Sequence, residues 1–505
     1  MSQIRRQSII SSVMVYIGFA LGFLNTYLFT KEGGFSQEEY GLVGIFVAVA
    51  SLMFAVANFG MPSYIGKFFP YYKSNLQQAQ NDMLTWAIVV AAFGFLLVMA
   101  GGIYFKDLII LKFGKNSPLL VKYYYWIFPL GFGLTLFSVL EAFAWQLRRA
   151  VITNYLREIQ FRLFTTLLIV LSFAAVITSF DVFIKIYAFT YIATALILLL
   201  YLFSKKEINF TFTASLVTRK YYKKILSLIS FVFGGTLIYG ISLIFDSLVI
   251  ASVMPDGLAD VAVFSLGQYM ASIVQAPQRG IIASSIGPLS QAWKDKDMGR
   301  ILKIYRQSSI NQLIFAAGMF TLIWLNFTDG IFTFNLQKGY LDAKWVFFFV
   351  GLYRIMDMGT GVNAQIIATS TLWRFEFYTG TILLALTLPL TYFLTKSSLG
   401  IIGPPVATLI AFFVYNSIRY WLLLKRYKLQ PFTIKTLYTL LLAIVVYFIC
   451  WLLFRHQQGF WWMVLRSSTF LILYIYGVVT LRLSSDLQPV WQTFLKKTGI
   501  KKGLQ

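Results

Sequence analysis

Arg354 and Asp357 lie three residues apart inside an otherwise apolar stretch, 343–368. Residues spaced by three or four positions share one face of a helix, and Gln365 continues this face, with Asn363 close by. Guanidinium, carboxylate and amide groups together can hold an anionic, hydroxylated ligand through charge-assisted hydrogen bonds. Two interpretations stay open: these residues form the wall of a water-filled cavity, or a neutralised ion pair that holds two helices together.

Three further charged residues lie inside apolar stretches: Glu141, Asp246 and Arg279. A charged side chain at the middle of a bilayer costs roughly 2.5–3.5 kcal/mol, so such residues normally face the protein interior. Asp246 is either a carboxylate that couples H+ or Na+ to transport, or one held by Ser/Thr or backbone donors. Glu141 either titrates or simply lies near the cytoplasmic boundary.

Arg279 follows Pro277, a residue that can kink a helix and free backbone carbonyl groups. The planar guanidinium of an arginine pairs bidentately with phosphate. The alternative is that the long side chain of Arg279 reaches the membrane interface, where its charge is hydrated.

Chemistry that requires a metal, a disulfide or a nucleotide finds little support in the sequence. The chain has one cysteine, Cys450, and one histidine, His456, which cannot build a metal site alone. No Gly-rich phosphate loop ending in Gly-Lys-Ser/Thr occurs, and the loops between apolar stretches leave no room for a soluble domain. We therefore expect no catalytic residue, no cofactor and no enzymatic activity.

The elements that must position these charges are membrane-spanning helices. The 505 residues are 58% hydrophobic and 12% charged, and the mean hydropathy is +0.71. A bilayer-spanning helix needs about 20 mostly apolar residues. About fourteen stretches meet this criterion, and the sequence predicts an all-α polytopic membrane protein with spans near 9–29, 41–62, 83–104, 123–146, 160–179, 183–203, 227–252, 259–283, 308–328, 343–368, 376–396, 399–424, 434–454 and 461–481.

The net charge of +24 is mostly a topological signal. Loops rich and poor in Lys and Arg alternate along the chain, with the Lys106–Lys122 loop as the exception. Because cytoplasmic loops carry the excess of Lys and Arg, both termini are expected in the cytoplasm. This distribution argues against a nucleic-acid partner and favours attraction to the anionic headgroups of the lipid bilayer.

A basic stretch divides the chain after six spans. We expect an N-terminal six-helix lobe, a cytoplasmic basic linker, a C-terminal six-helix lobe, and two additional spans with a basic tail, over residues 1–204, 205–226, 227–430 and 431–505. Six spans per lobe give a parallel repeat, as in transporters that rock two halves around a central site.

A comparison of the two halves at a fixed offset supports this repeat. Ser63–Gly66 lies over Ser284–Gly287, Asn25 lies over Asp246, and Asn58 lies over Arg279. Asn25 and Asn58 are therefore further candidates for residues that line a central cavity.

Three helices carry a family resemblance. The tenth span and its exit contain Tyr353-Arg354-Ile355-Met356-Asp357 and Gly361-Val362-Asn363-Ala364-Gln365. The eighth span contains Gln275-Ala276-Pro277. The twelfth span contains Gly400-Ile401-Ile402-Gly403-Pro404-Pro405. The tenth and twelfth resemble the Wzx-like polysaccharide and O-antigen flippases of the multidrug/oligosaccharidyl-lipid/polysaccharide exporter superfamily. The eighth resembles the corresponding helix of the lipid II flippases.

This resemblance implies two six-helix lobes around a cationic cavity in the bacterial cytoplasmic (inner) membrane. The implied substrate is a polyprenyl-diphosphate-linked oligosaccharide, a precursor of lipopolysaccharide O-antigen, capsule or exopolysaccharide, and association with polysaccharide biosynthesis enzymes is expected. Arg279 and Arg354 would bind its anionic head, and Asn363 and Gln365 its sugars. Asp357 would position Arg354. Asp246 would couple an ion gradient to the rocking of the two lobes.

Other functions remain open. Lipid II flippases carry cationic residues inside the first span, whereas this chain has none there after Arg6, which favours a polysaccharide precursor over lipid II. A drug/cation antiporter of the same superfamily would have an acidic, aromatic cavity, and Arg354 and Arg279 argue against it. A membrane-embedded glycosyltransferase or polymerase would need a large external loop. A purely structural membrane scaffold would leave the buried charges without a use.

Overall fold

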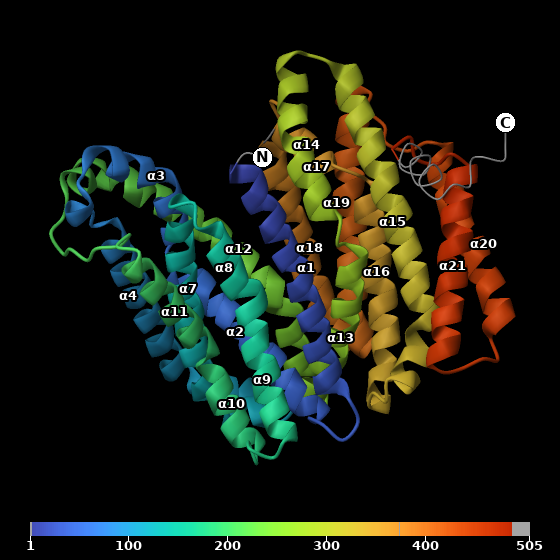
Figure 1. Cartoon of the computed structure of the whole chain (residues 1–505), viewed down its shortest axis with the longest axis horizontal. Helices are drawn as coiled ribbons and strands as arrows, with labels where there is room; N and C mark the ends of the chain where they lie inside the picture. Colours follow the sequence, from blue (N-terminus) through green and yellow to red (C-terminus); the bar gives the residue numbers. More distant parts are fainter. Residues whose placement is uncertain (1–2, 373, 487–505) are drawn as a thin grey trace. The chain divides into compact units, whose positions relative to one another are not determined.

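A computed structural model describes residues 3–372 and 374–486, without the side chains of residues 3–13, 231, 235, 238, 239, 243, 279, 283 and 377. The described residues are helices and their connections, with no β-strand among them (Figure 1). Among the described residues, ten helices are long and apolar enough to cross a membrane, and Met14–Thr30 and Ile244–Val253 are shorter apolar helical segments. The predicted all-α polytopic membrane class is confirmed.

The chain forms two compact units, Met1–Ala262 and Val263–Gln505. The first unit contains α1 (Gln3–Thr30), α2 (Gln37–Ala57), α3 (Met61–Asn75), α4 (Met83–Tyr104), α5 (Lys106–Phe113), α6 (Pro118–Lys122), α7 (Ile127–Gln146), α8 (Ala150–Asn154), the π-helix η3 (Tyr155–Gln160), α9 (Phe161–Phe173), α10 (Phe180–Ala188), α11 (Thr190–Ser204) and α12 (Leu216–Val253). α12 begins inside the stretch predicted as a linker. The expected limits of the two lobes stay a prediction.

The second unit begins within α13 (Gly257–Val274). It continues through α14 (Gln278–Lys294), α15 (Met298–Thr333), α16 (Ala343–Gly359), α17 (Asn363–Ala368), α18 (Arg374–Lys396), α19 (Gly403–Tyr427), α20 (Ile434–Phe454) and α21 (Phe460–Thr480). In Figure 1, α20 and α21 lie beside α15, and all three share one apolar core. The hydroxyl of Tyr474 donates to the carbonyl oxygen of Ile314 at 2.9 Å, which anchors α21 on α15.

Several predicted spans are interrupted in the described part of the chain, among them 183–203, which is divided between α10 and α11 at Phe189. The expected kink near Pro277 is a complete break, since α13 ends at Val274 and Pro277 caps the start of α14. The predicted span 41–62 ends at Ala57, and a turn through Gly60 leads into α3. The predicted span 343–368 breaks between α16 and α17. Both α3 and α14 follow such a break and contain an internal proline, and the repeat of the two halves stays a prediction.

Helix α7 forms the centre of the first unit, where it packs against α2, α4 and α11. Gly133 of α7 lies directly against the backbone of α11: a Cβ atom at this position would come within 2.3 Å of the backbone nitrogen of Ile192. Small residues allow such close approach between membrane helices.

Replacement of Gly133 by alanine should therefore destabilise the protein by about 1–3 kcal/mol, because backbone cannot move aside as a flexible side chain can. Thermal unfolding of the purified protein in detergent measures this effect. Gly101→Ala on α4 is the matched control, since nothing lies within 4 Å of the added atom. An unchanged melting temperature for Gly133→Ala would contradict the packing of α7 on α11.

Candidate functional site

Polar side chains from four helices form a hydrogen-bond network in the second unit. Its members are Gln278 of α14, Asp357 and Thr360 at the end of α16, Asn363 of α17 and Asn416 of α19, which we call the amide network. The Asp357 carboxylate accepts hydrogen bonds from Gln278 Nε2 at 2.9 Å and from Asn416 Nδ2 at 3.3 Å. Asn416 Oδ1 in turn accepts from Asn363 Nδ2 at 2.9 Å. Two of the predicted site residues, Asp357 and Asn363, are thus brought together.

The break between α16 and α17 positions this network. Gly361 has a φ of +65°, a conformation that residues with a Cβ rarely adopt. Serines of α15 satisfy the backbone groups that the break frees: Ser309 Oγ donates to Gly359 O at 2.5 Å, and Val362 N donates to Ser308 Oγ at 3.3 Å. Irregular backbone at membrane depth is tolerated when it is buried in protein and satisfied in this way.

Arg354 lies one turn before Asp357 on α16, but its side chain takes another direction. No ion pair joins Arg354 to Asp357 among the described residues. The guanidinium carbon lies 4.6 Å from the centroid of the Tyr353 ring, and the buried Nε has no hydrogen-bond partner in the described part of the chain. The neutralised ion pair that one interpretation required is therefore not formed. Gln365 lies half-buried on α17.

A second arginine close to the network was not among the predicted site residues. Arg419 of α19 is only 2% exposed. Its Nη2 pairs with Glu376 of α18, and its guanidinium carbon lies 3.6 Å from the centroid of the Tyr415 ring. Because Arg419 follows Asn416 by three residues, one face of α19 carries both the amide and the cation.

The predicted residues of the first unit are tied to neighbouring helices. Asn25 of α1 donates from Nδ2 to Arg162 O at 2.9 Å and accepts at Oδ1 from Thr166 Oγ1 at 2.6 Å, so both ends of its amide bind α9. Asn58 caps the end of α2, where its Oδ1 accepts from Gly60 N at 2.7 Å. These bonds give each side chain a structural role. Whether either residue lines a transport cavity stays a prediction.

Glu141 is buried in α7 and pairs with Arg157 of the π-helix η3. The Arg157 Nη2 atom lies 2.5 Å from Glu141 Oε2, while Oε1 is buried without a partner among the described residues. A second ion pair joins Glu158 of η3 to Arg162 at the start of α9, at 2.9 Å. π-Helical turns are rare and often occur at functional sites. The structure therefore gives Glu141 a partner that the sequence interpretation did not name.

Asp246 and Arg279 are the remaining predicted site residues. Asp246 lies half-buried on α12 in the first unit. Arg279 follows Gln278 on α14, but its side chain lies outside the described residues. In the described part of the chain, no group of three or more His, Cys, Asp or Glu side chains could hold a metal ion.

Replacement of Asp357 by alanine tests the amide network. The amide groups of Gln278 and Asn416 would lose their common acceptor, which should cost about 1–3 kcal/mol of unfolding free energy. The measurement is thermal unfolding in detergent, with Asp342→Ala as the control because Asp342 is exposed. Equal melting temperatures for the two variants would show that the network does not stabilise the second unit.

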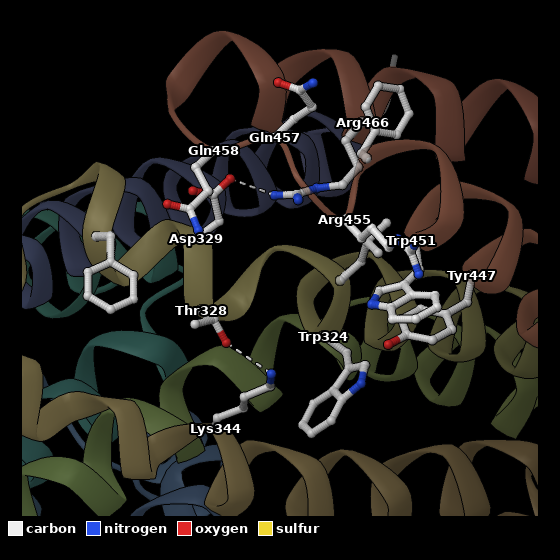
Figure 2. Close-up of a pocket in the computed structure, with 13 residues that line it drawn as sticks. Trp324, Thr328, Asp329, Lys344, Tyr447, Trp451, Arg455, Gln457, Gln458 and Arg466 are labelled. Atoms are coloured by element: carbon white, nitrogen blue, oxygen red, sulfur yellow. Dashed lines mark hydrogen bonds and ion pairs between the residues drawn. The ribbon is translucent and has the colours of Figure 1, made fainter.

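Aromatic and cationic side chains line a cavity of about 200 Å3 where α15, α16, α20 and α21 meet (Figure 2). On one side, Arg466 Nη2 pairs with Asp329 Oδ2 at 2.7 Å, and both side chains are only 8% exposed. On the other side, Lys344 Nζ donates to Thr328 Oγ1 at 2.9 Å and lies 4.7 Å from the centroid of the Trp324 ring. The buried ion pair fixes the last span, α21, to α15.

Solved structures with the same fold are known. The chain superimposes on the lipid II flippase MurJ in an inward closed conformation with a TM-score of 0.73 and 17% identity, covering 94% of this chain and 98% of MurJ. It superimposes on an inward-facing multidrug resistance MATE family transporter of the MOP superfamily with a TM-score of 0.60 and 16% identity, covering 81% of this chain and 96% of the transporter. The chain is therefore a multi-pass membrane protein with the fold of these transporters. No protein-family model and no curated relative matches the sequence.

Proposed function

We propose that this chain is a flippase that moves a polyprenyl-diphosphate-linked oligosaccharide across the cytoplasmic membrane by alternating access. A sugar head and a diphosphate cannot cross about 30 Å of hydrocarbon unaided, because their polar groups would lose hydration. A flippase must therefore replace the lost water with protein donors, while the lipid tail stays in the bilayer.

The observation that carries this proposal is the state of Arg354. Its guanidinium forms no ion pair with a described carboxylate although the Nε atom is buried, and a cation within a membrane span is costly unless it meets an anion. The amide network begins one turn further along α16 and supplies groups that can exchange hydrogen bonds with sugar hydroxyls. The diphosphate would bind the Arg354 guanidinium, and the sugars would bind near the amides of Asn363 and Gln365. Arg279 is a second candidate for the diphosphate.

Two substrates compete with this proposal. The similarity to MurJ over nearly the whole of both chains favours a lipid-linked substrate, and lipid II is the nearest alternative. The similarity to a multidrug MATE transporter keeps a drug/cation antiporter as the second alternative. Arg354 favours an anionic substrate, because a cationic drug would be repelled by it.

The proposal is tested in cells from which the gene has been deleted. Polyprenyl-linked precursors are extracted after treatment with a membrane-impermeant reagent that oxidises glycans, so that their membrane face is known. We expect precursors to accumulate on the cytoplasmic face and wild-type protein to restore their export. Unchanged precursor amount and sidedness, in a strain without a second flippase, would reject the proposal and favour efflux of a small molecule.

The driving force is part of the proposal. No nucleotide-binding loop occurs in the sequence, so an ion gradient is the expected energy source. Asp246 and Glu141 are the carboxylates that could take up H+ or Na+ in the spans. Transport in proteoliposomes with an imposed H+ or Na+ gradient identifies the ion, and transport that is independent of both gradients would remove this role.

A further inference from the structure

A basic groove lies between α3 and α12 in the first unit, and none of the residues assigned to transport above lines it. Its volume is about 620 Å3. Residues of two helices line it, and we call it the lysine groove: Lys67, Phe68 and Tyr71 of α3, with Tyr221, Lys223, Lys224, Ser227 and Leu228 of α12. The distribution of Lys and Arg predicts that this end of the first unit faces the cytoplasm.

The groove carries three positive charges and no carboxylate among its lining residues. Lys67, Lys223 and Lys224 are all exposed, and none of them forms an ion pair with a described carboxylate. The two lysines of α12 instead lie near tyrosine rings, with Lys224 Nζ 5.7 Å from the centroid of Tyr221. Three like charges around one groove repel each other, so an anion bound between them would be stabilised.

Aromatic rings form the apolar part of the groove. The ring centroids of Tyr71 and Tyr221 are 5.2 Å apart, and Phe68 lies within 6.0 Å of Tyr221. Such contacts between aromatic rings stabilise their arrangement beyond the burial of apolar area. A ligand in this groove therefore meets both cationic and apolar surface.

A buried chain of hydrogen bonds holds the two helices together beside the groove. Tyr64 donates from its hydroxyl to that of Tyr72 at 2.8 Å, and the Tyr72 hydroxyl lies 2.7 Å from Thr218 Oγ1. Thr218 then donates to Asp82 Oδ2 at 2.8 Å, and Asp82 is completely buried. Burial raises the pKa of both tyrosines, so these hydroxyl groups stay protonated. The groove is thus built on a rigid base, and a preorganised site loses less entropy on binding.

We propose that the lysine groove binds the phosphate of an anionic lipid headgroup at the cytoplasmic surface. Ammonium groups pair with phosphate oxygens, and the tyrosine and phenylalanine rings contact the apolar part of the headgroup region. The groove volume of about 620 Å3 leaves room for a phosphate group. Two lipids share this chemistry: a bilayer phospholipid and a transported lipid diphosphate.

Native mass spectrometry of the purified full-length protein tests the proposal. The probes are phosphatidylglycerol, phosphatidylcholine, a polyprenyl diphosphate and inorganic diphosphate, each titrated separately. We expect the wild type to bind at least one of the two anionic lipids in preference to phosphatidylcholine. The triple variant Lys67→Gln/Lys223→Gln/Lys224→Gln should bind it about 100-fold more weakly, from the combined loss of three cationic contacts.

Two further variants make the result specific. Lys294→Gln/Lys296→Gln/Lys303→Gln removes the same charge from exposed positions outside the groove and should bind as the wild type does. Replacement of the three groove lysines by arginine should restore binding. An equal loss in the control triple would show attraction by net charge alone and overturn the proposal.

The probes also separate the sources of phosphate. Preference for phosphatidylglycerol assigns the groove to the bilayer, and preference for polyprenyl diphosphate assigns it to a transported lipid. Binding of inorganic diphosphate without either lipid would overturn the assignment to a lipid headgroup. Because this measurement follows binding and not transport, its result is independent of the proposed flippase activity.

Discussion

Replacement of Arg354 by methionine should reduce transport by at least about tenfold while the protein keeps or gains thermal stability. A hydrogen bond to a charged group contributes about 1.5–3 kcal/mol, which corresponds to roughly 10–100-fold in transport. Stability should not fall, because the buried Nε of Arg354 has no partner to lose among the described residues. Methionine is also unbranched and flexible, and it removes the positive charge from this span.

Both quantities are measured on the same preparations, as export in cells or flipping in proteoliposomes and as the melting temperature in detergent. Arg300→Met is the matched control, because Arg300 is exposed near the start of α15 and should change neither quantity. Loss of stability together with transport in Arg354→Met would mean that the arginine holds helices together. Normal transport at normal protein level would remove Arg354 from the substrate site.

Replacement of Arg466 by methionine should lower the stability of the second unit by about 3–5 kcal/mol. Arg466 and Asp329 are both almost completely buried, and Arg466 Nε also donates to Asn326 Oδ1 at 2.9 Å. Without the arginine, the Asp329 carboxylate stays buried with only neutral donors, the backbone of Gly459 and the hydroxyl of Thr333. Arg455→Met, at the exposed end of α20, is the control.

A double variant shows whether the loss of stability comes from the uncompensated Asp329 charge or from lost packing. Replacing both members of a buried ion pair by apolar residues is often nearly neutral, because no uncompensated charge remains. Asp329→Leu/Arg466→Met should therefore be more stable than Arg466→Met alone, although it removes more of the native contacts. Equal instability of the single and double variants would mean that packing, and not charge, dominates at this site.

The sequence predicts the helices of this fold more closely than the contacts between them. The predicted spans 83–104 and 434–454 have the same limits as α4 and α20, because long apolar stretches flanked by polar residues define helices in a bilayer. The prediction of one span over 41–62 does not contain the break after Ala57, although Gly60 and Pro62 mark it. The apolar stretch continues through this turn, so hydropathy alone does not reveal it.

The sequence indicates only those residues of the candidate site whose charge lies inside an apolar span. A charge inside a span singled out Arg354, Asp357 and Glu141, and the same criterion applied to the span 461–481 would have found Arg466. Asn416 is uncharged, so this criterion does not find it. Its role in the amide network depends on its hydrogen bond to Asp357, which is distant in sequence. Helical spacing alone permits an Arg354–Asp357 ion pair. Among the described residues, the Asp357 carboxylate instead accepts hydrogen bonds from Gln278 and Asn416, which the sequence does not place beside it.

The ion pair between Asp329 and Arg466 joins residues separated by 137 positions, and this separation matters while the chain is being made. Asp329 enters the membrane region with α15, but its partner is synthesised only with the last span. At about 5–20 residues per second, the delay is roughly 7–27 s. During this interval the carboxylate must stay hydrated at the bilayer surface or be shielded by the insertion machinery. A chain that stops before α21 would keep this charge exposed indefinitely, so quality-control proteases should remove it even though most of its spans are complete.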